Sequence, residues 1–226
     1  SDVEKFILDF NIEDEYRLQA LRDNRLPIEI CAPKHGEKAS LNGFPHPYQL
    51  SLKLLLFQQI RHQYHNDSIL VSMPTGSGKT VLAMELILDL IRTSAIDDAP
   101  IEICWLVDSK ELCEQSLKSF QKLWKQKGDR PVTCQRYFGA FDNLDHSEVT
   151  KIPKITFAAF TLLTPRLAQR DPQVISLLEN TTHLFIDEAH GANAITYNSV
   201  LHAYRDLRKQ PSIIGLTATP FRNDDV

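Results

Sequence analysis

Two spacings of hydrophobic residues alternate along most of this chain. Short apolar runs are separated by longer stretches in which apolar residues recur every three or four positions. Short runs of this kind are typical of buried parallel strands, whereas the longer spacing is typical of helices that bury one face. The expected strands are 69–71, 101–107, 132–137, 155–160, 183–187 and 212–217. The sequence therefore predicts an α/β domain in which strands and helices alternate.

The first 43 residues do not follow this alternation. They carry many charges, with a helix expected at about 12–22 and then a loop rich in Pro, Lys and Gly. We interpret 1–43 as an N-terminal extension, a solvated helical appendage rather than a specific binding module. We expect 44–226 to form one globular domain, because the chain shows no internal repeat and no second core.

Composition narrows the classes of protein to be considered. The 226 residues are 42% hydrophobic and 24% charged, which suits one sizeable soluble core. The net charge of −4 indicates no general nucleic-acid-binding surface, so any such contact must be local. The chain begins at Ser1 rather than Met and ends just after a motif, which suggests a piece of a longer protein.

Cysteine usage and hydropathy predict the compartment. The four cysteines lie far apart without a C-x-x-C pair, so we expect reduced thiols buried in a cytoplasmic protein. No apolar run approaches the 18 residues of a membrane span, and the N-terminus lacks the features of a signal peptide. We therefore expect no membrane partner.

The segment 72–80, SMPTGSGKT, follows an apolar run and precedes a helical pattern. Gly76 and Gly78 lack a Cβ, so their backbone N–H groups can approach a triphosphate closely. Lys79 supplies a charge for the β- and γ-phosphates, and the Thr80 hydroxyl can bind Mg²⁺ at the start of the helix. The expected nucleotide contacts in the loop are Thr75, Gly76, Ser77, Gly78, Lys79 and Thr80.

A helix is expected from Pro47, which suits a first turn, with Leu50, Leu54 and Phe57 on one apolar face. Gln49 lies near its start. A glutamine amide can donate and accept at once, which matches the N6 donor and N7 acceptor of adenine. Taken alone, a solvated surface glutamine is the simpler interpretation.

A second chemical motif follows the apolar residues 184–186, where the chain reads Asp187, Glu188, Ala189, His190. Two adjacent carboxylates at the end of a strand suit nucleotide hydrolysis, because one can hold Mg²⁺ while the other deprotonates water. We assign the metal to Asp187 and the base to Glu188. The assignment gains weight from the phosphate loop before the motif and from GLTATP (215–220) after it.

Together these motifs resemble the first RecA-like domain of a superfamily 2 helicase or translocase of the DEAH/DExH kind, over about 44–221. The resemblance implies a RecA-like P-loop domain with a mostly parallel central sheet and helices on both faces. Loops of this family often read PTGSGKT, which accounts for Met73 where the general P-loop has glycine. The resemblance also implies roles for single residues. It implies adenine recognition by Gln49, catalysis by Lys79, Asp187, Glu188 and His190, and coupling to motion by Thr217 and Thr219.

The resemblance further implies a nucleic-acid contact in 105–115, WLVDSKELCEQ, through Ser109, Lys110 and Gln115. Ser109 can also cap the helix expected at 110–125. Three more lysines line another face of that helix, and a solvated charged face is the simpler interpretation for them. They are Lys118, Lys122 and Lys125. The segment 155–163 resembles the next backbone-contacting segment, although Ala159 stands where threonine is common.

These observations predict the ATP-binding half of a motor that uses ATP and Mg²⁺ to move on nucleic acid, with DNA favoured over RNA. A nucleotide-dependent binding or scaffolding module is the alternative, and ATP turnover by the full-length protein distinguishes the two. The resemblance implies a second RecA-like domain of the same polypeptide, absent from this chain, so we expect weak activity of residues 1–226 alone. The ending LTATPFR also resembles helicase-like subunits of restriction systems.

Overall fold

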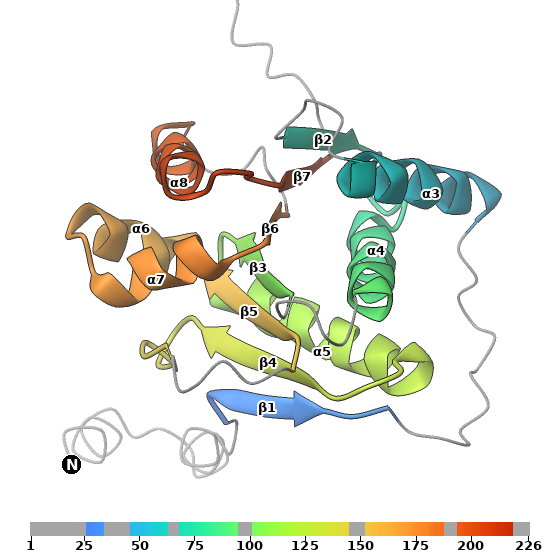
Figure 1. Cartoon of the computed structure of the whole chain (residues 1–226), viewed down its shortest axis with the longest axis horizontal. Coiled ribbons are helices and arrows are strands. Elements are labelled where there is room, and N and C mark those ends of the chain that lie inside the picture. The colour runs from blue at the N-terminus through green and yellow to red at the C-terminus, as the bar shows by residue number, and fades with distance from the viewer. Residues whose placement is uncertain are drawn as a thin grey trace, which may run out of the picture.

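We analysed a computed structural model, which describes residues 26–33, 46–62, 68–94, 101–144, 152–187 and 194–218. The described residues form a seven-stranded sheet in the order β1-β4-β5-β3-β6-β7-β2, flanked by helices (Figure 1). The strands are β1 (Ile28–Cys31), β2 (Ser68–Ser72), β3 (Glu102–Val107), β4 (Val132–Tyr137), β5 (Lys154–Ala159), β6 (His183–Ile186) and β7 (Ile213–Thr217). The helices are α3 (Pro47–His62), α4 (Lys79–Thr93), α5 (Lys110–Lys127), α6 (Phe160–Ala168), α7 (Pro172–Asn180) and α8 (Ala194–Leu207).

The sheet is parallel except for one of its two outermost strands. β2, β7, β6, β3, β5 and β4 pair in parallel, while β1 pairs antiparallel with β4. The helices between successive parallel strands return the chain to the opposite end of the sheet, as parallel pairing requires. The carboxyl ends of the parallel strands therefore meet at one edge, which brings the end of β2 and the end of β6 together. The expected α/β fold with a mostly parallel sheet is confirmed.

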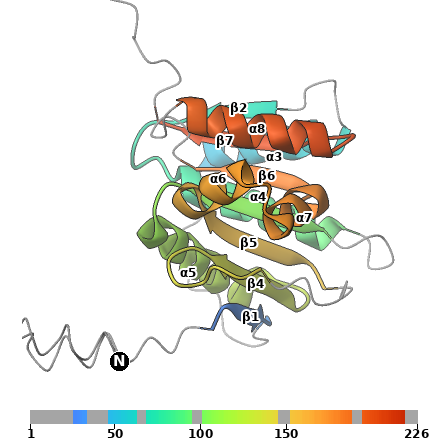
Figure 2. The same ribbon diagram turned by 90° about the vertical axis from the view of Figure 1, so that its left-hand side faces the viewer.

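Helices cover both faces of this sheet, as expected. Helices α3, α4 and α5 lie on one face of the sheet, and α6, α7 and α8 lie on the other face. Figure 2 shows the molecule from the side of α6, α7 and α8. Alternate residues of the central strands enter the two cores. On β3, Trp105 packs with the first group of helices, whereas Leu106 packs with the second. This alternation explains why the central strands read as continuous apolar runs.

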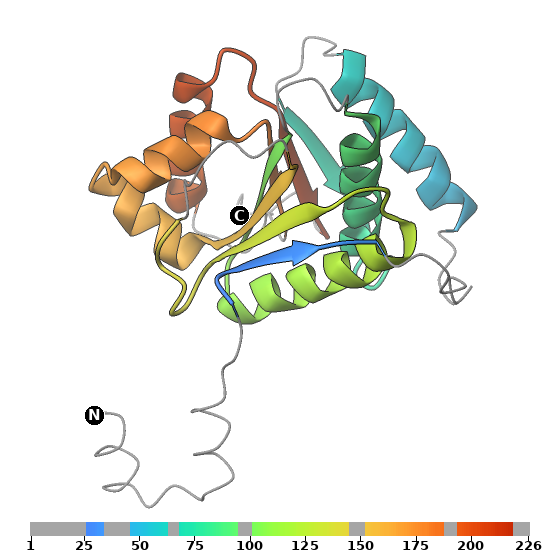
Figure 3. The same ribbon diagram turned by 60° about the horizontal axis from the view of Figure 1, so that its bottom comes forward.

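Strand β1 lies within the range that the sequence assigned to an N-terminal extension, where no strand was expected. It runs antiparallel to β4, beside α5 (Figure 3), with Ile28 opposite Gln135 and Cys31 opposite Val132. Cys31 is buried in the first core. The sheet therefore includes a strand that precedes residue 44, where the domain was expected to begin. The helix expected at 12–22 lies outside the described residues.

Two other expectations differ from the structure. Leu50 and Leu54 were expected on the buried face of α3, but they are 41% and 60% exposed. Leu56, at 4% exposure, is buried instead, because α3 turns that side toward α4. The strand expected at 155–160 ends one residue early, and Phe160 begins α6.

The four cysteines are buried and carry free thiols. Burial raises the pKa of the Cys104 thiol to about 12, so it stays protonated and unreactive at neutral pH. Among the described helices, none combines the length and hydrophobicity that a membrane crossing requires.

Candidate functional site

The glycine loop lies between β2 and α4 at the carboxyl edge of the sheet. Gly76 and Gly78 have φ of 73° and 85°, a left-handed conformation that favours glycine. Gly78 is the N-cap of α4 and makes no side-chain cap hydrogen bond to the first turn of the helix. The loop thus has the geometry of an anion cradle at a helix N-terminus.

The start of the loop is fixed by the core and by β7. Met73, which replaces the general glycine, is only 4% exposed and belongs to the first core. Its backbone N–H donates to the Thr217 carbonyl at 3.0 Å. Thr217, expected to couple hydrolysis to motion, therefore lies directly beside the loop and is itself buried.

Gln49 contacts this loop from α3. Its Nε2 donates to the Ser77 carbonyl at 2.7 Å, and its Oε1 accepts from the His46 N–H at 2.7 Å. A Cβ on Gly78 would lie 2.6 Å from the same Nε2, so a larger residue there would displace this amide in addition to straining the backbone at φ 85°. The amide that we expect to recognise adenine is thus bonded within the protein and supports the loop. Adenine recognition by Gln49 stays a prediction.

Thr80 and Asp187, the two expected Mg²⁺ ligands, meet although they lie 107 residues apart. Thr80 Oγ1 donates to Asp187 Oδ2 at 2.9 Å. Asp187 follows the last residue of β6 and is 6% exposed, and Lys79 beside Thr80 is 6% exposed as well. A hydroxyl and a carboxylate oxygen are the donors that Mg²⁺ prefers, so this pair fits that ion. Glu188, His190 and Thr219 lie outside the described residues.

The expected nucleic-acid residues lie at the same sheet edge, at the start of α5. The Ser109 hydroxyl accepts from the Leu112 N–H at 3.3 Å, which confirms its expected role as a helix cap. Lys110 and Gln115 are exposed and line a groove of about 770 Å³. The opposite wall of the groove is the segment 138–141, which the sequence analysis did not single out. Ala159 is buried at the end of β5 and offers no surface contact.

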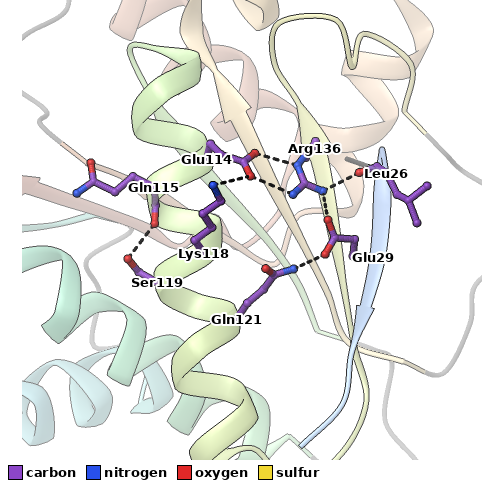
Figure 4. A network of polar contacts seen from close by, with 8 residues as sticks. All are labelled: Leu26, Glu29, Glu114, Gln115, Lys118, Ser119, Gln121 and Arg136. Carbon is purple, nitrogen blue, oxygen red and sulfur yellow. Dashed lines mark hydrogen bonds and ion pairs between the residues drawn. The ribbon is translucent and has the colours of Figure 1, made fainter. Parts of the chain in front are cut away.

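Below this groove, a buried arginine joins three elements. Arg136 on β4 donates to both carboxylate oxygens of Glu114 on α5, at 3.0 and 3.2 Å, and also pairs with Glu29 on β1 (Figure 4). Gln121 donates to Glu29 at 2.7 Å. Burial opposes ionisation of Glu29, but the hydrogen bonds from Arg136 and Gln121 prevail and lower its pKa. Sequence patterns gave no sign of this network, because its members are brought together only by strand pairing.

Comparison with known proteins identifies the family. Residues 43–222 match the family described as type III restriction enzyme, res subunit. The chain therefore belongs to this family. The match confirms the resemblance to the first RecA-like domain of superfamily 2 helicases of the restriction-subunit-like group, and with it a helicase-type ATP-binding domain. Strand β1 lies outside the matched residues.

Individual relatives are distant. The chain is 23% identical over 205 residues to a protein named ATP-dependent DNA helicase MPH1 from Candida albicans, covering 86% of this chain and 16% of that protein. It spans less than a fifth of the length of that relative. A crystal structure of the DUF1998 helicase MrfA superposes with a TM-score of 0.57 at 20% identity, over 80% of this chain and 27% of that one. The Sulfolobus solfataricus SWI2/SNF2 ATPase core in complex with dsDNA gives 0.55 at 16% identity, over 80% and 33%. These two likenesses concern the fold.

Proposed function

We propose that this chain is the ATP-binding half of an ATP-dependent nucleic-acid helicase or translocase, which hydrolyses ATP with Mg²⁺ to drive movement. The observation that carries the proposal is the hydrogen bond between Thr80 and Asp187 beside the glycine loop. It joins the end of one motif to the start of another across the sheet edge. Motifs matched by chance would have no reason to meet in this way.

Each residue has a chemical role in this proposal. The backbone N–H groups of the glycine loop and the Lys79 ammonium bind the β- and γ-phosphates. Thr80 and Asp187 would hold Mg²⁺, which would neutralise charge on the phosphates. Glu188 accepts the proton of the attacking water, and His190 belongs to the same motif. Thr217, bonded to the loop through Met73, passes a change at the phosphates to β7.

DNA is the favoured track. The MPH1 relative is named a DNA helicase, and the Sulfolobus ATPase core was solved with dsDNA. Lys110 and Gln115, exposed at the start of α5, are the proposed contacts together with Ser109. A second RecA-like domain of the same polypeptide would supply the arginine that stabilises phosphoryl transfer, a contribution of about 10³ to 10⁵ in rate.

Titration calorimetry with ATP tests the metal pair directly. The variant Thr80→Val removes the hydroxyl and keeps the shape of the side chain, so we expect Mg·ATP to bind at least about tenfold more weakly. Binding of ATP without Mg²⁺ should change little. Thr93→Val is the matched control, because Thr93 lies in the last turn of α4 and its hydroxyl bonds only within the helix, to Asp89 and Leu90 carbonyls. Equal Mg·ATP affinity in both variants would contradict the proposed metal pair.

A further inference from the structure

The groove beside α5 continues well past the residues that the family motif accounts for. We define the α5 groove as the groove of about 770 Å³ between the 110–122 face of α5 and the segment 138–141. Lys110 and Gln115 line the groove near the start of α5, and Lys118 and Lys122 line the helical turns that follow. At a rise of about 1.5 Å per residue, the three lysines span roughly 18 Å of the helix.

The charge of the groove is positive, although the chain as a whole carries −4. Three lysines and two glutamates, Glu111 and Glu114, line it. Glu114 is held by two hydrogen bonds from Arg136, which is 3% exposed in its side chain. Its negative charge is thus compensated from below, and the ammonium of Lys118, whose side chain is 69% exposed, points toward the same carboxylate at 3.8 Å (Figure 4).

The far wall is a partly aromatic turn. The Phe141 N–H donates to the Phe138 carbonyl at 3.1 Å, and the two rings meet edge to face at 6.0 Å. The Arg136 guanidinium lies 5.7 Å from the Phe141 ring centre, so the wall and the floor are joined. Gly139 turns the chain at φ 61°, and a Cβ there would contact the Lys110 side chain. The groove is therefore a formed feature of the fold.

We propose that Lys118 and Lys122 bind the phosphodiester backbone of nucleic acid, so that the strand contacted by Lys110 continues along α5 in the groove. The proposal deepens the proposed function and rests on it. A row of lysines matches a polymer with regularly repeated charge, because one strand of B-form DNA carries a phosphate about every 3.4 Å of axis. Such contacts fix the position of the protein without reading sequence.

Residues near the start of the described chain hold Arg136 in place below the groove. Arg136, which compensates Glu114, is itself held by Glu29 and by the Leu26 carbonyl at 2.6 Å. Both belong to β1 and the residues just before it, outside the family match at 43–222. A segment outside the family match thus helps to maintain the groove.

The test measures oligonucleotide binding by the full chain. Fluorescence anisotropy with a labelled single strand, between 50 and 200 mM salt, compares wild type with Lys118→Gln/Lys122→Gln. Loss of two phosphate contacts lowers the slope of log affinity against log salt by about 1.4 and weakens binding up to about 25-fold at 0.1 M salt. The control Arg92→Gln/Lys209→Gln makes the same change of charge at exposed positions on the opposite edge of the sheet and should match wild type.

The outcomes separate this inference from the function on which it rests. If wild type binds nucleic acid and the α5 double variant keeps both its affinity and its salt slope, the groove inference is wrong and the proposed function stands. The same result would follow if an acidic protein segment were the natural occupant of the groove. If wild type binds no oligonucleotide while Lys110→Gln is equally inert, the nucleic-acid part of the proposed function fails as well. Unchanged Mg·ATP binding in the double variant shows that its fold is intact.

Discussion

The glycine loop and the α5 groove lie at the same edge of one sheet, yet they are built in different ways. The loop is made of consecutive residues between β2 and α4, and its shape comes from backbone conformation at Gly76 and Gly78. The groove lies between α5 and the segment 138–141, and beneath it Arg136 on β4 forms ion pairs with Glu114 on α5 and Glu29 on β1. A contiguous site survives many changes outside its own segment, whereas an assembled site depends on every element that contributes to it.

The largest effect is expected at Arg136. Arg136→Ala removes the guanidinium that pairs with the buried Glu114 carboxylate and with Glu29, and breaking a buried pair in this way costs about 3–5 kcal/mol. Urea denaturation measures the change in the free energy of unfolding. Replacing both partners by apolar residues, as in Arg136→Met/Glu114→Leu, should recover much of the loss. A cost below about 1 kcal/mol for Arg136→Ala would show that the groove does not depend on this pair.

An intermediate effect is expected at Gly78, on the loop side of the comparison. Gly78→Ala combines strain at φ 85°, about 1–2 kcal/mol, with a contact of 2.6 Å to Gln49 Nε2. Gly76→Ala is the matched control, since it has similar strain at φ 73° but no atom within 4 Å of the added Cβ. Gly78→Ala should therefore lower the melting temperature more than Gly76→Ala. Adding Gln49→Ala to Gly78→Ala should remove the difference, and no rescue would contradict the role of the Gln49 contact.

The smallest effect concerns Glu29 and pH. Its folded-state pKa lies below the ordinary value of 4.5, so its stabilising contribution is present above that pH and is lost as the pH falls through the folded-state pKa. Glu29→Gln should therefore lose less stability than wild type between about pH 5 and pH 3. The effect should be a fraction of a kcal/mol, because Glu29 is 32% exposed.

Glu111→Gln is the control for this experiment, because Glu111 is 70% exposed on α5 and its substitution changes the charge equally. Burial lowers the pKa of His183 to about 4, so acid destabilises all three proteins through that residue. This destabilisation through His183 is the same in all three proteins, so it cancels when they are compared. Identical pH profiles of wild type and Glu29→Gln would show that the ion pair between Glu29 and Arg136 does not contribute to stability.

The sequence predicted those features of the fold and the site that depend on residues close together in the chain. Hydrophobic spacing located the six parallel strands within one or two residues, because buried runs such as that of β3 are fixed by their own composition. The pairing of Thr80 with Asp187 could be foreseen, since parallel strands place their carboxyl ends together. Sequence could not place β1, because Glu29 interrupts its apolar residues and the strand gains its structure from pairing with β4. The contact of Gln49 with Ser77 was equally hidden, because it depends on how α3 packs.

The two tryptophans of the chain give it an optical property that follows from their places in the core. Trp105 stacks on Phe185 with ring centres 6.0 Å apart, and Phe185 lies two residues before Asp187. Among the residues that the structure describes, the Trp105 indole N–H finds no hydrogen-bond partner, whereas the Trp124 indole donates to the Arg130 carbonyl at 2.8 Å. The two fluorophores therefore sit in different polar surroundings, and Trp124→Phe would leave a single blue-emitting reporter. That reporter would lie in the protein interior, on the strand next to β6 and close to Asp187, the proposed Mg²⁺ ligand.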